Sequence, residues 1–115
     1  MVDIKRGDIL LVNFEPVRGS EQGGIRPSLV IQNDLGNKYG PTTIIAPITA
    51  KEFNKEFPTN VYLLKEDSKL ERDSTILFNQ IRTIDKSRII KRISALDETI
   101  IKKVDMAIKI SLGLD

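Results

Sequence analysis

The chain has 115 residues, a formal net charge of +2 and 40% apolar residues, and it contains neither cysteine nor histidine. This length predicts one domain, residues 1–115, with a single hydrophobic core. The missing residue types exclude a disulfide framework, a cysteine- or histidine-ligated zinc site, a cysteine nucleophile and a histidine general base. Any catalysis therefore depends on Arg, Lys, Ser, Thr, Tyr, Asp, Glu or the backbone.

The sequence contains no segment typical of a targeting signal or a membrane span. The N-terminal segment is charged from Asp3 onward, and apolar runs such as Ile9–Val12 are far shorter than the ~20 residues of a membrane helix. We therefore expect a soluble protein of the cytoplasm, and the lack of cysteine fits a reducing compartment.

The first half of the chain is rich in residues that break helices. Six of the seven glycines and all five prolines precede residue 59, so strands joined by turns are predicted there. Short apolar, β-branched segments lie between these breaks and continue beyond them. The predicted strands are Asp8–Phe14, Ser28–Asn33, Thr42–Thr49, Asn60–Lys65, Thr75–Thr83 and Ile89–Ile93.

The C-terminal segment changes to a helical period. Apolar residues recur on one helical face at Ile100, Ile101, Val104, Ala107, Ile108 and Leu112. Ser94 and Asp97 have the spacing of a capping box, and Gly113 is suited to end the helix. Five or six short strands followed by one helix predict a small, strongly bent antiparallel sheet or barrel.

A polar, glycine-rich loop with the sequence GSEQGGIRP joins the first two predicted strands at residues 19–27. The simplest interpretation is a hairpin loop whose glycines adopt positive φ. Pro27, however, restricts the preceding Arg26 to an extended backbone, which holds a guanidinium group at the entrance to a strand. The loop is therefore a candidate site as well as a turn.

Two further segments contain residues suited to binding. Pro47 lies inside a predicted strand, which indicates a sheet edge or a bulge, and Thr49 stands where that strand leaves the sheet. Residues 51–58, KEFNKEFP, combine basic and aromatic side chains that can hold phosphates and stack on bases. The structural alternatives are an ordinary strand-end threonine and two phenylalanines folded onto the core.

Charged residues gather at two places that call for a chemical interpretation. Five basic residues accompany a single acid, Asp85, and can follow a phosphate backbone or form a solvated face. These basic residues are Arg82, Lys86, Arg88, Lys91 and Arg92. Carboxylates recur at positions 67–73, but their spacing matches no metal-binding loop and basic neighbours can pair with them, so no metal site is expected.

Six segments, taken in order along the whole chain, resemble the MazF/PemK family of toxins. They are RGD at 6–8, GSEQGGIRP at 19–27, LVIQND at 29–34, PIT at 47–49, ERDS at 71–74 and QIRTID at 80–85. The resemblance implies an α+β, mainly β fold. This fold is the SH3-like small barrel of the PemK/CcdB-like plasmid toxins, with five to seven antiparallel strands and a C-terminal helix.

The same resemblance implies a function. The chain would be the toxin of a type II toxin–antitoxin system, a homodimer that needs no cofactor and no metal. It would cut single-stranded mRNA at specific short sequences without the ribosome, and so inhibit translation and growth. A cognate antitoxin would occupy the RNA groove with an extended, acidic C-terminal tail.

The family's site residues transfer to matching positions. Its catalytic Arg and Thr correspond to Arg26 and Thr49, and the Glu of the loop motif corresponds to Glu21. The RNA-binding residues implied are Ser20, Gln22, Ser74, Asn79, Gln80 and Arg82. Asn79 departs from the Glu of close relatives, and an amide both donates and accepts where a carboxylate only accepts, so a relative's cut sequence is not transferred.

RNA cleavage of this kind requires no histidine. The 2′-hydroxyl attacks the adjacent phosphorus and expels the 5′-oxygen, which leaves a 2′,3′-cyclic phosphate or its 3′-phosphate product and a 5′-hydroxyl. Arg26 is suited to neutralise the charge that develops on the phosphorane, and Thr49 can donate a hydrogen bond to it. Glu21 is the candidate acceptor of the 2′-proton.

Two non-catalytic alternatives remain at this stage. Related toxins of the same barrel bind a protein target, DNA gyrase, through a C-terminal end that contains Trp. This chain has no Trp and keeps Arg26 and Thr49. An SH3-like adaptor for proline-rich peptides needs an aromatic-lined groove, whereas aromatic residues make up only 5% of this chain.

Overall fold

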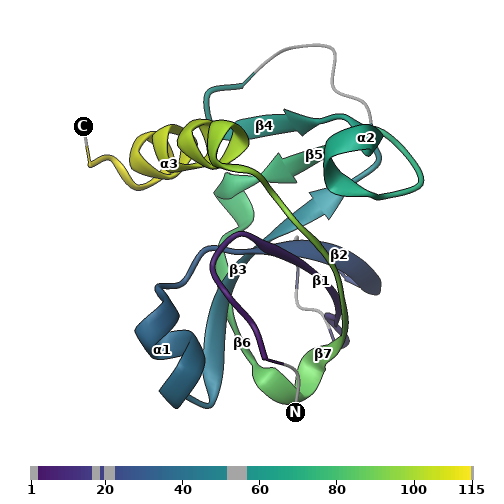
Figure 1. Ribbon diagram of the computed structural model, residues 1–115, viewed down its shortest axis with the longest axis vertical. Coiled ribbons are helices and arrows are strands. Elements are labelled where there is room, and N and C mark those ends of the chain that lie inside the picture. The colour runs from purple at the N-terminus through teal and green to yellow at the C-terminus, as the bar shows by residue number, and fades with distance from the viewer. Residues whose placement is uncertain (1–2, 17–18, 20–22, 52–56, 115) are drawn as a thin grey trace.

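A computed structural model describes residues 3–16, 19, 23–51 and 57–114, and it contains one antiparallel sheet with helices at both ends (Figure 1). The strands are β1 (Asp8–Asn13), β2 (Ile25–Val30), β3 (Thr42–Thr49), β4 (Asn60–Leu63), β5 (Ser74–Leu77), β6 (Arg82–Asp85) and β7 (Ile89–Ala95). The helices are α1 (Asp34–Tyr39), α2 (Lys65–Ser68), α3 (Glu98–Leu112) and the 3₁₀ turns η1 (Phe78–Gln80) and η2 (Lys86–Arg88).

The sheet has the strand order β4-β5-β3-β2-β1-β7, and β6 pairs with β3 beside this path. All the pairings are antiparallel. In the described part of the chain no pairing joins β4 to β7, so the sheet is strongly bent but open along its hydrogen-bonded path. The expected mainly β fold of five to seven antiparallel strands with a C-terminal helix is confirmed.

Strand β3 is the centre of the sheet and has two successive neighbours on one side. Residues 42–45 pair with β6 and residues 48–49 pair with β5, while η1 lies between those two partners. Pro47 lies at the interruption and has no N–H to donate to a ladder. The irregularity that the sequence predicts at Pro47 is therefore this break between β6 and β5.

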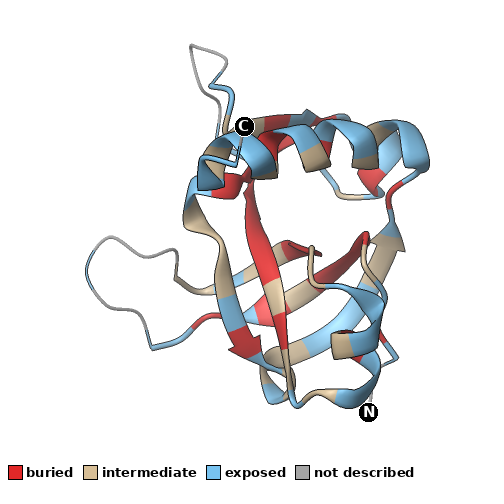
Figure 2. Ribbon diagram, turned by 90° about the vertical axis from the view of Figure 1, so that its left-hand side faces the viewer, coloured by how far each residue is buried: buried red, intermediate tan, exposed pale blue. Residues whose placement is uncertain are grey.

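Successive side chains point to opposite faces of a strand, so the bent sheet buries one apolar cluster on each face. One cluster contains Ile9, Leu29, Ile48, Phe78, Val104 and Ala107, the last two from α3. The other contains Leu10, Val12, Phe14, Val30, Ile45 and Ile84. Figure 2 shows this burial along the strands, with the outer side of α3 exposed.

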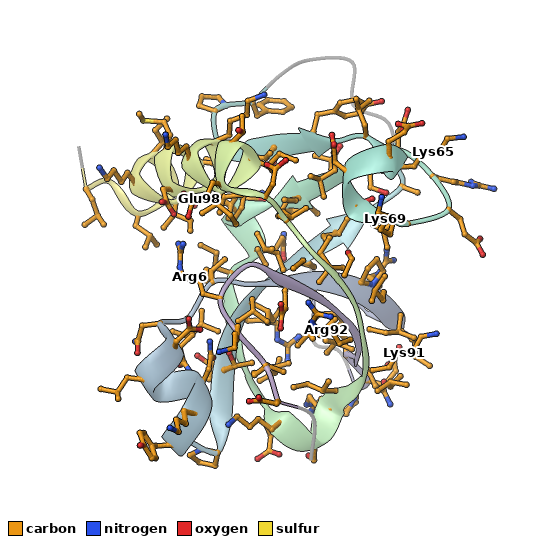
Figure 3. All side chains as sticks on the ribbon, in the orientation of Figure 1. Arg6, Lys65, Lys69, Lys91, Arg92 and Glu98 are labelled. Carbon is orange, nitrogen blue, oxygen red and sulfur yellow. The ribbon has the colours of Figure 1, made fainter. Side chains whose placement is uncertain are left out.

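The Arg6–Asp8 segment has a structural role. Gly7 turns the chain into β1 with a φ of +94°, and a Cβ at this position would lie 3.2 Å from Ile101 Cδ1. The Arg6 guanidinium donates to the carbonyl of Ile31 and to the carboxylate of Asp105 at 2.7 Å (Figure 3). These contacts fasten the N-terminal segment to α3.

Helix α1 lies in the half of the chain where only strands and turns were expected. Its cap explains why the helix forms, because the side chain of Asn33 accepts a hydrogen bond from Gly36 N at 2.8 Å. The end of the predicted strand at Asn33 therefore begins a helix. The sequence does not predict this helix, because the glycines and prolines of the first half, Gly36 and Gly40 among them, favour strands joined by turns.

Two boundaries in the second half also differ from the predictions. The single strand predicted at Thr75–Thr83 is divided by η1 into β5 and β6, each of which pairs with a different part of β3. The capping box predicted from Ser94 and Asp97 is wrong: Asp97 is itself the N-cap of α3 and accepts from Ile100 N at 3.0 Å. Gly113 ends α3 at a φ of +69°, as predicted.

In the described residues no helix is both long and apolar enough to cross a membrane.

Candidate functional site

The pairing of β2 with β3 brings Arg26 and Thr49 to one face of the sheet. Ser28 lies opposite Pro47, and extending this register by two residues places Arg26 opposite Thr49, with both side chains on the same side. The ladder itself ends at Ser28 and Pro47. On its other side Thr49 lies opposite Thr75 of β5, so the Thr75 side chain lies on the same face.

Arg26 is braced from its own loop. Its backbone is extended, as its position before Pro27 predicts, but β2 begins at Ile25 and not at the predicted Ser28, so Arg26 lies within the strand opposite Val12. Its Nε donates to the carbonyl of Gly23 at 2.6 Å. The side chain is half-buried, and no carboxylate of the described residues pairs with it. The outer nitrogens of the guanidinium are therefore available to an anionic ligand.

Thr49 presents its hydroxyl hydrogen. The side chain is buried, and its Oγ1 accepts a hydrogen bond from Lys51 N at 3.2 Å. Because this bond uses an oxygen lone pair, the hydroxyl can still donate its hydrogen to a bound group. The hydrogen bond from Lys51 N thus holds Thr49 Oγ1 in place, and the hydroxyl hydrogen has no acceptor among the described residues.

Arg82 adds a second guanidinium on the same face. It lies opposite Ile45 in the pairing of β6 with β3, so its side chain shares the face of Pro47 and Thr49. Its Cζ lies 5.2 Å from the centre of the Phe14 ring, and its Nη1 is buried with no hydrogen-bond partner in the part of the chain that the structure describes. Buried polar atoms almost always have partners, so this donor keeps hydrogen-bonding capacity that the described residues do not use.

A pocket of about 290 Å³ adjoins Thr49 at the same end of β3. The remaining lining residues are Lys51, Phe57, Thr59, Asn60, Leu77, Asn79 and Gln80. Asn79 and Gln80 belong to the set expected from the sequence, and Lys51 and Phe57 come from the basic and aromatic segment. Thr59, Asn60 and Leu77 were not anticipated, because their part in the pocket depends on the pairing of β4 with β5.

Not every predicted site residue reaches this face. Ser74 is buried opposite Leu63, on the other side of the strand from Thr75, and its Oγ donates to the carbonyl of Arg72 at 2.9 Å. The predicted residues Ser20, Glu21 and Gln22 lie outside the described residues, as do positions 52–56. Of the predicted site residues, the structure therefore describes five on or beside this face: Arg26, Thr49, Asn79, Gln80 and Arg82.

Most of the basic cluster serves the fold. The Lys86 ammonium donates to the carbonyl of Asn37, and the Arg88 guanidinium donates to the carbonyls of Asn13 and Glu15 at 3.1 and 2.6 Å. Arg92 pairs with the buried carboxylate of Asp8 at 3.2 Å. Figure 3 places Arg92 and its neighbour Lys91 on β7. A continuous phosphate-binding strip is therefore not formed by these side chains.

The described carboxylates are also engaged in local structure. Asp73 accepts from Lys65 N at 2.9 Å and from the Tyr62 hydroxyl at 3.3 Å. The hydroxyl and N–H of Ser87 lower the pKa of the exposed Asp85 carboxyl, and the backbone N–H of Arg6 lowers that of Asp34. Within the described ranges, no three carboxylates approach closely enough to hold a metal ion.

Comparison with known proteins identifies relatives over almost the whole length. A family model described as "PemK-like, MazF-like toxin of type II toxin-antitoxin system" matches residues 5–112. An Endoribonuclease MazF of Staphylococcus saprophyticus is 50% identical over 111 residues, which cover 96% of this chain and 92% of that protein.

Solved structures share the fold. MazF from Deinococcus radiodurans superposes with a TM-score of 0.82 at 25% identity, covering 98% of this chain and 99% of that one. A mycobacterial endoribonuclease in complex with its cognate antitoxin has a TM-score of 0.82 at 19% identity, and 97% of each chain is covered. The seven-stranded open sheet with its C-terminal helix is thus a fold found in several solved proteins.

Proposed function

Because the chain belongs to the family of PemK-like, MazF-like toxins of type II toxin–antitoxin systems, we propose that Arg26 and Thr49 form its catalytic centre. The chain is an endoribonuclease toxin, like the relative that is 50% identical to it. Its proposed substrate is single-stranded mRNA, cut at short specific sequences independently of the ribosome and of any metal ion. Such cleavage would inhibit translation and growth.

The proposed reaction is a transesterification within the RNA. The 2′-hydroxyl attacks the adjacent phosphorus, a bond forms between them, and the bond to the 5′-oxygen breaks. Negative charge develops on the non-bridging oxygens of the phosphorane. Arg26 is suited to neutralise this charge, because its outer nitrogens pair with no carboxylate of the described residues and its Nε donates to the carbonyl of Gly23.

Thr49 is proposed to donate its hydroxyl hydrogen to one of those oxygens. A preorganised donor of this kind contributes about 3–4 kcal/mol to the stability of the transition state. The hydrogen bond from Lys51 N to Thr49 Oγ1 holds the oxygen in position before the RNA arrives. This arrangement avoids reorganisation during the reaction.

Two proton transfers complete the proposed reaction. Glu21 is assigned the 2′-proton on the resemblance of its loop, because a carboxylate can accept a proton that a guanidinium cannot. The leaving 5′-oxygen takes up a proton from Arg26 or from water. The products are a 2′,3′-cyclic phosphate, or its 3′-phosphate hydrolysis product, and a 5′-hydroxyl.

The proposed RNA contacts extend from this centre in two directions. Asn79 and Gln80 line the pocket beside Thr49, and Arg82 faces the same side of the sheet as Arg26. Ser20 and Gln22 are assigned by the loop motif. Ser74 is assigned by its motif alone, since its hydroxyl already donates to Arg72.

We further propose partners for this centre. Structures of similar fold are described as MazE–MazF assemblies and as an endoribonuclease with its cognate antitoxin. By analogy, a cognate antitoxin with an acidic C-terminal tail would bind this chain, where its carboxylates would meet Arg26 and Arg82. We also propose that the protein is a homodimer and that it acts in the cytoplasm.

The observation that supports this proposal most directly is the register of β2 and β3, which, extended by two residues, brings Arg26 and Thr49 to one face of the sheet. Among the described residues, no carboxylate pairs with Arg26 and no acceptor takes the Thr49 hydroxyl hydrogen. The test is incubation of a long single-stranded RNA with the protein in excess EDTA, followed by analysis of both product ends. We expect undiminished cleavage with 5′-hydroxyl and cyclic phosphate ends. Loss of cleavage in EDTA that Mg²⁺ restores would refute the mechanism.

A further inference from the structure

The pocket beside Thr49 is lined by polar and aromatic side chains that have no role in the proposed reaction. Its volume is about 290 Å³, and only Thr49 belongs to the catalytic pair. Phe57 contributes an aromatic ring that is 48% exposed, and the buried Leu77 contributes an apolar wall. Three side-chain amides complete the lining, those of Asn60, Asn79 and Gln80.

The three amides are not used by the fold. Among the described residues, none of these side chains donates or accepts a hydrogen bond. Each amide offers a carbonyl acceptor and two N–H donors, so the pocket holds unused groups of both kinds. By contrast, the amide of Asn37, at the other end of the sheet, is fully bonded within the protein.

The backbone fixes the positions of these groups relative to one another. Asn60 N donates to the carbonyl of Phe57 at 2.9 Å, which sets the turn that leads into β4. Phe78 N donates to the carbonyl of Thr59 at 2.9 Å, and Asn60 lies opposite Leu77 in the pairing of β4 with β5. The aromatic ring and the amides thus lie on a preorganised unit.

We propose that this pocket binds one unpaired nucleobase of the RNA, belonging to a nucleotide next to the cleaved bond, with Phe57 as the stacking surface and Asn60 as a residue that reads the base edge. A planar ring with donors and acceptors on its edge matches an aromatic face bordered by amides. The shared Thr49 places this nucleotide beside the reacting phosphate. The inference rests on the proposed endoribonuclease function and adds two specificity-determining residues to it.

The first test changes the donor capacity of Asn60 without changing its shape. Asn60→Asp can only accept, so it should alter the base preferred at one position adjoining the cut by about 10-fold, in favour of bases that present an amino group. The measurement is sequencing of the 5′-hydroxyl ends released from a random RNA pool. Asn33→Asp is the matched control, since it adds the same charge at the α1 cap and retains the capping oxygen.

The second test removes the stacking surface and does not depend on cleavage. Phe57→Leu should weaken the binding of an RNA that carries 2′-deoxyribose at the cut position by about 10-fold. The control is Tyr39→Leu, another exposed aromatic residue, on α1. Far-ultraviolet circular dichroism checks that both variants are folded.

The outcomes separate the pocket from the reaction. Unchanged base preference in Asn60→Asp together with unchanged affinity in Phe57→Leu would overturn the pocket proposal while leaving the endoribonuclease intact. A wild-type protein that binds RNA but does not cut it would refute the reaction, and the affinity of Phe57→Leu would still decide the pocket. Equal changes in both controls would also overturn the proposal, because they would reflect general charge or surface effects.

Discussion

Polar side chains lie on one face of the sheet along β3 and the strands beside it, but their hydrogen bonding differs between the two ends of β3. Thr43, at the start of the strand, donates to the buried amide of Asn37 at 2.6 Å. Toward the other end, Ser28 lies opposite Pro47 and its Oγ is buried with no partner among the described residues. The same holds for the Nη1 of Arg82, which lies opposite Ile45 in the middle of β3. The Thr43 end is therefore fully hydrogen-bonded within the protein, whereas the groups toward the Thr49 end keep hydrogen-bonding capacity that the described residues do not use.

Asn37 illustrates how complete the bonding is at the Thr43 end. Its Oδ1 also accepts from Gln32 Nε2 at 3.1 Å, and its Nδ2 donates to the carbonyl of Gln32 at 2.9 Å. A fully satisfied network of this kind stabilises one arrangement of α1 against β3. Substitutions at the two ends should therefore change different properties of the protein.

The largest effect is expected at the unsatisfied end. Arg26→Ala should reduce the single-turnover cleavage rate about 100- to 1000-fold, because the charge on the phosphorane loses its preorganised partner. The free energy of unfolding should change little. Arg72→Ala, an exposed arginine whose guanidinium has no partner in the described structure, is the control and should cleave normally. Normal turnover in Arg26→Ala would contradict its assigned role.

The satisfied end should show the reverse behaviour. Asn37→Ala leaves the buried hydroxyl of Thr43 without its partner and removes one of the two hydrogen bonds that Gln32 Nε2 donates, so the free energy of unfolding should fall by about 2 kcal/mol. Urea denaturation followed by circular dichroism measures this loss. The cleavage rate of the folded protein should be unchanged, and a large loss of rate without a loss of stability would reverse the comparison.

A smaller effect is expected at Ser28, and it has the opposite sign. Its hydroxyl is fully buried and has no partner among residues 3–16, 19, 23–51 and 57–114, so Ser28→Ala should raise the free energy of unfolding by about 1 kcal/mol. The same urea titration measures the change. Destabilisation comparable to that of Asn37→Ala would mean that the hydroxyl is as well bonded as the Asn37 amide.

The smallest effect concerns Asp34, which accepts from Arg6 N at 2.6 Å. That hydrogen bond lowers the pKa of its carboxyl below the usual 3.8, so the ionised form stabilises the folded state above this pH. This contribution is lost as the pH falls through the lowered pKa. The difference in unfolding free energy between the wild type and Asp34→Asn should therefore shrink from pH 7 to pH 3, and a constant difference would contradict the linkage.

The sequence predicted the fold where local patterns suffice. The apolar run at Thr42–Thr49 coincides with β3, and the helical face with Gly113 after it locates α3. The short helix α1 escaped prediction because six residues give too little periodicity and its cap is a single Asn33 contact. The division of the predicted strand at Thr75–Thr83 depends on how β3 pairs, which no local pattern records.

The site was predictable only in part. The loop motif and Pro27 indicate Arg26, Pro47 and the strand end indicate Thr49, and the family resemblance implies their catalytic roles. Their common face follows from the register of two strands. The orphaned atoms of Ser28 and Arg82 depend on burial, which the sequence does not specify. No sequence pattern indicates that Asn60 lines the pocket, because its position there depends on the pairing with Leu77.

The central claim is that the Thr49 end of this face promotes attack by the RNA's own 2′-hydroxyl. A single RNA containing one cut site tests it when 2′-deoxyribose replaces the ribose on the 5′ side of the cleaved bond. The unsubstituted RNA should be cut in EDTA to give a 5′-hydroxyl end, and the substituted RNA should bind and remain intact at that bond. Cleavage of the substituted RNA at the same position would show that another nucleophile is used.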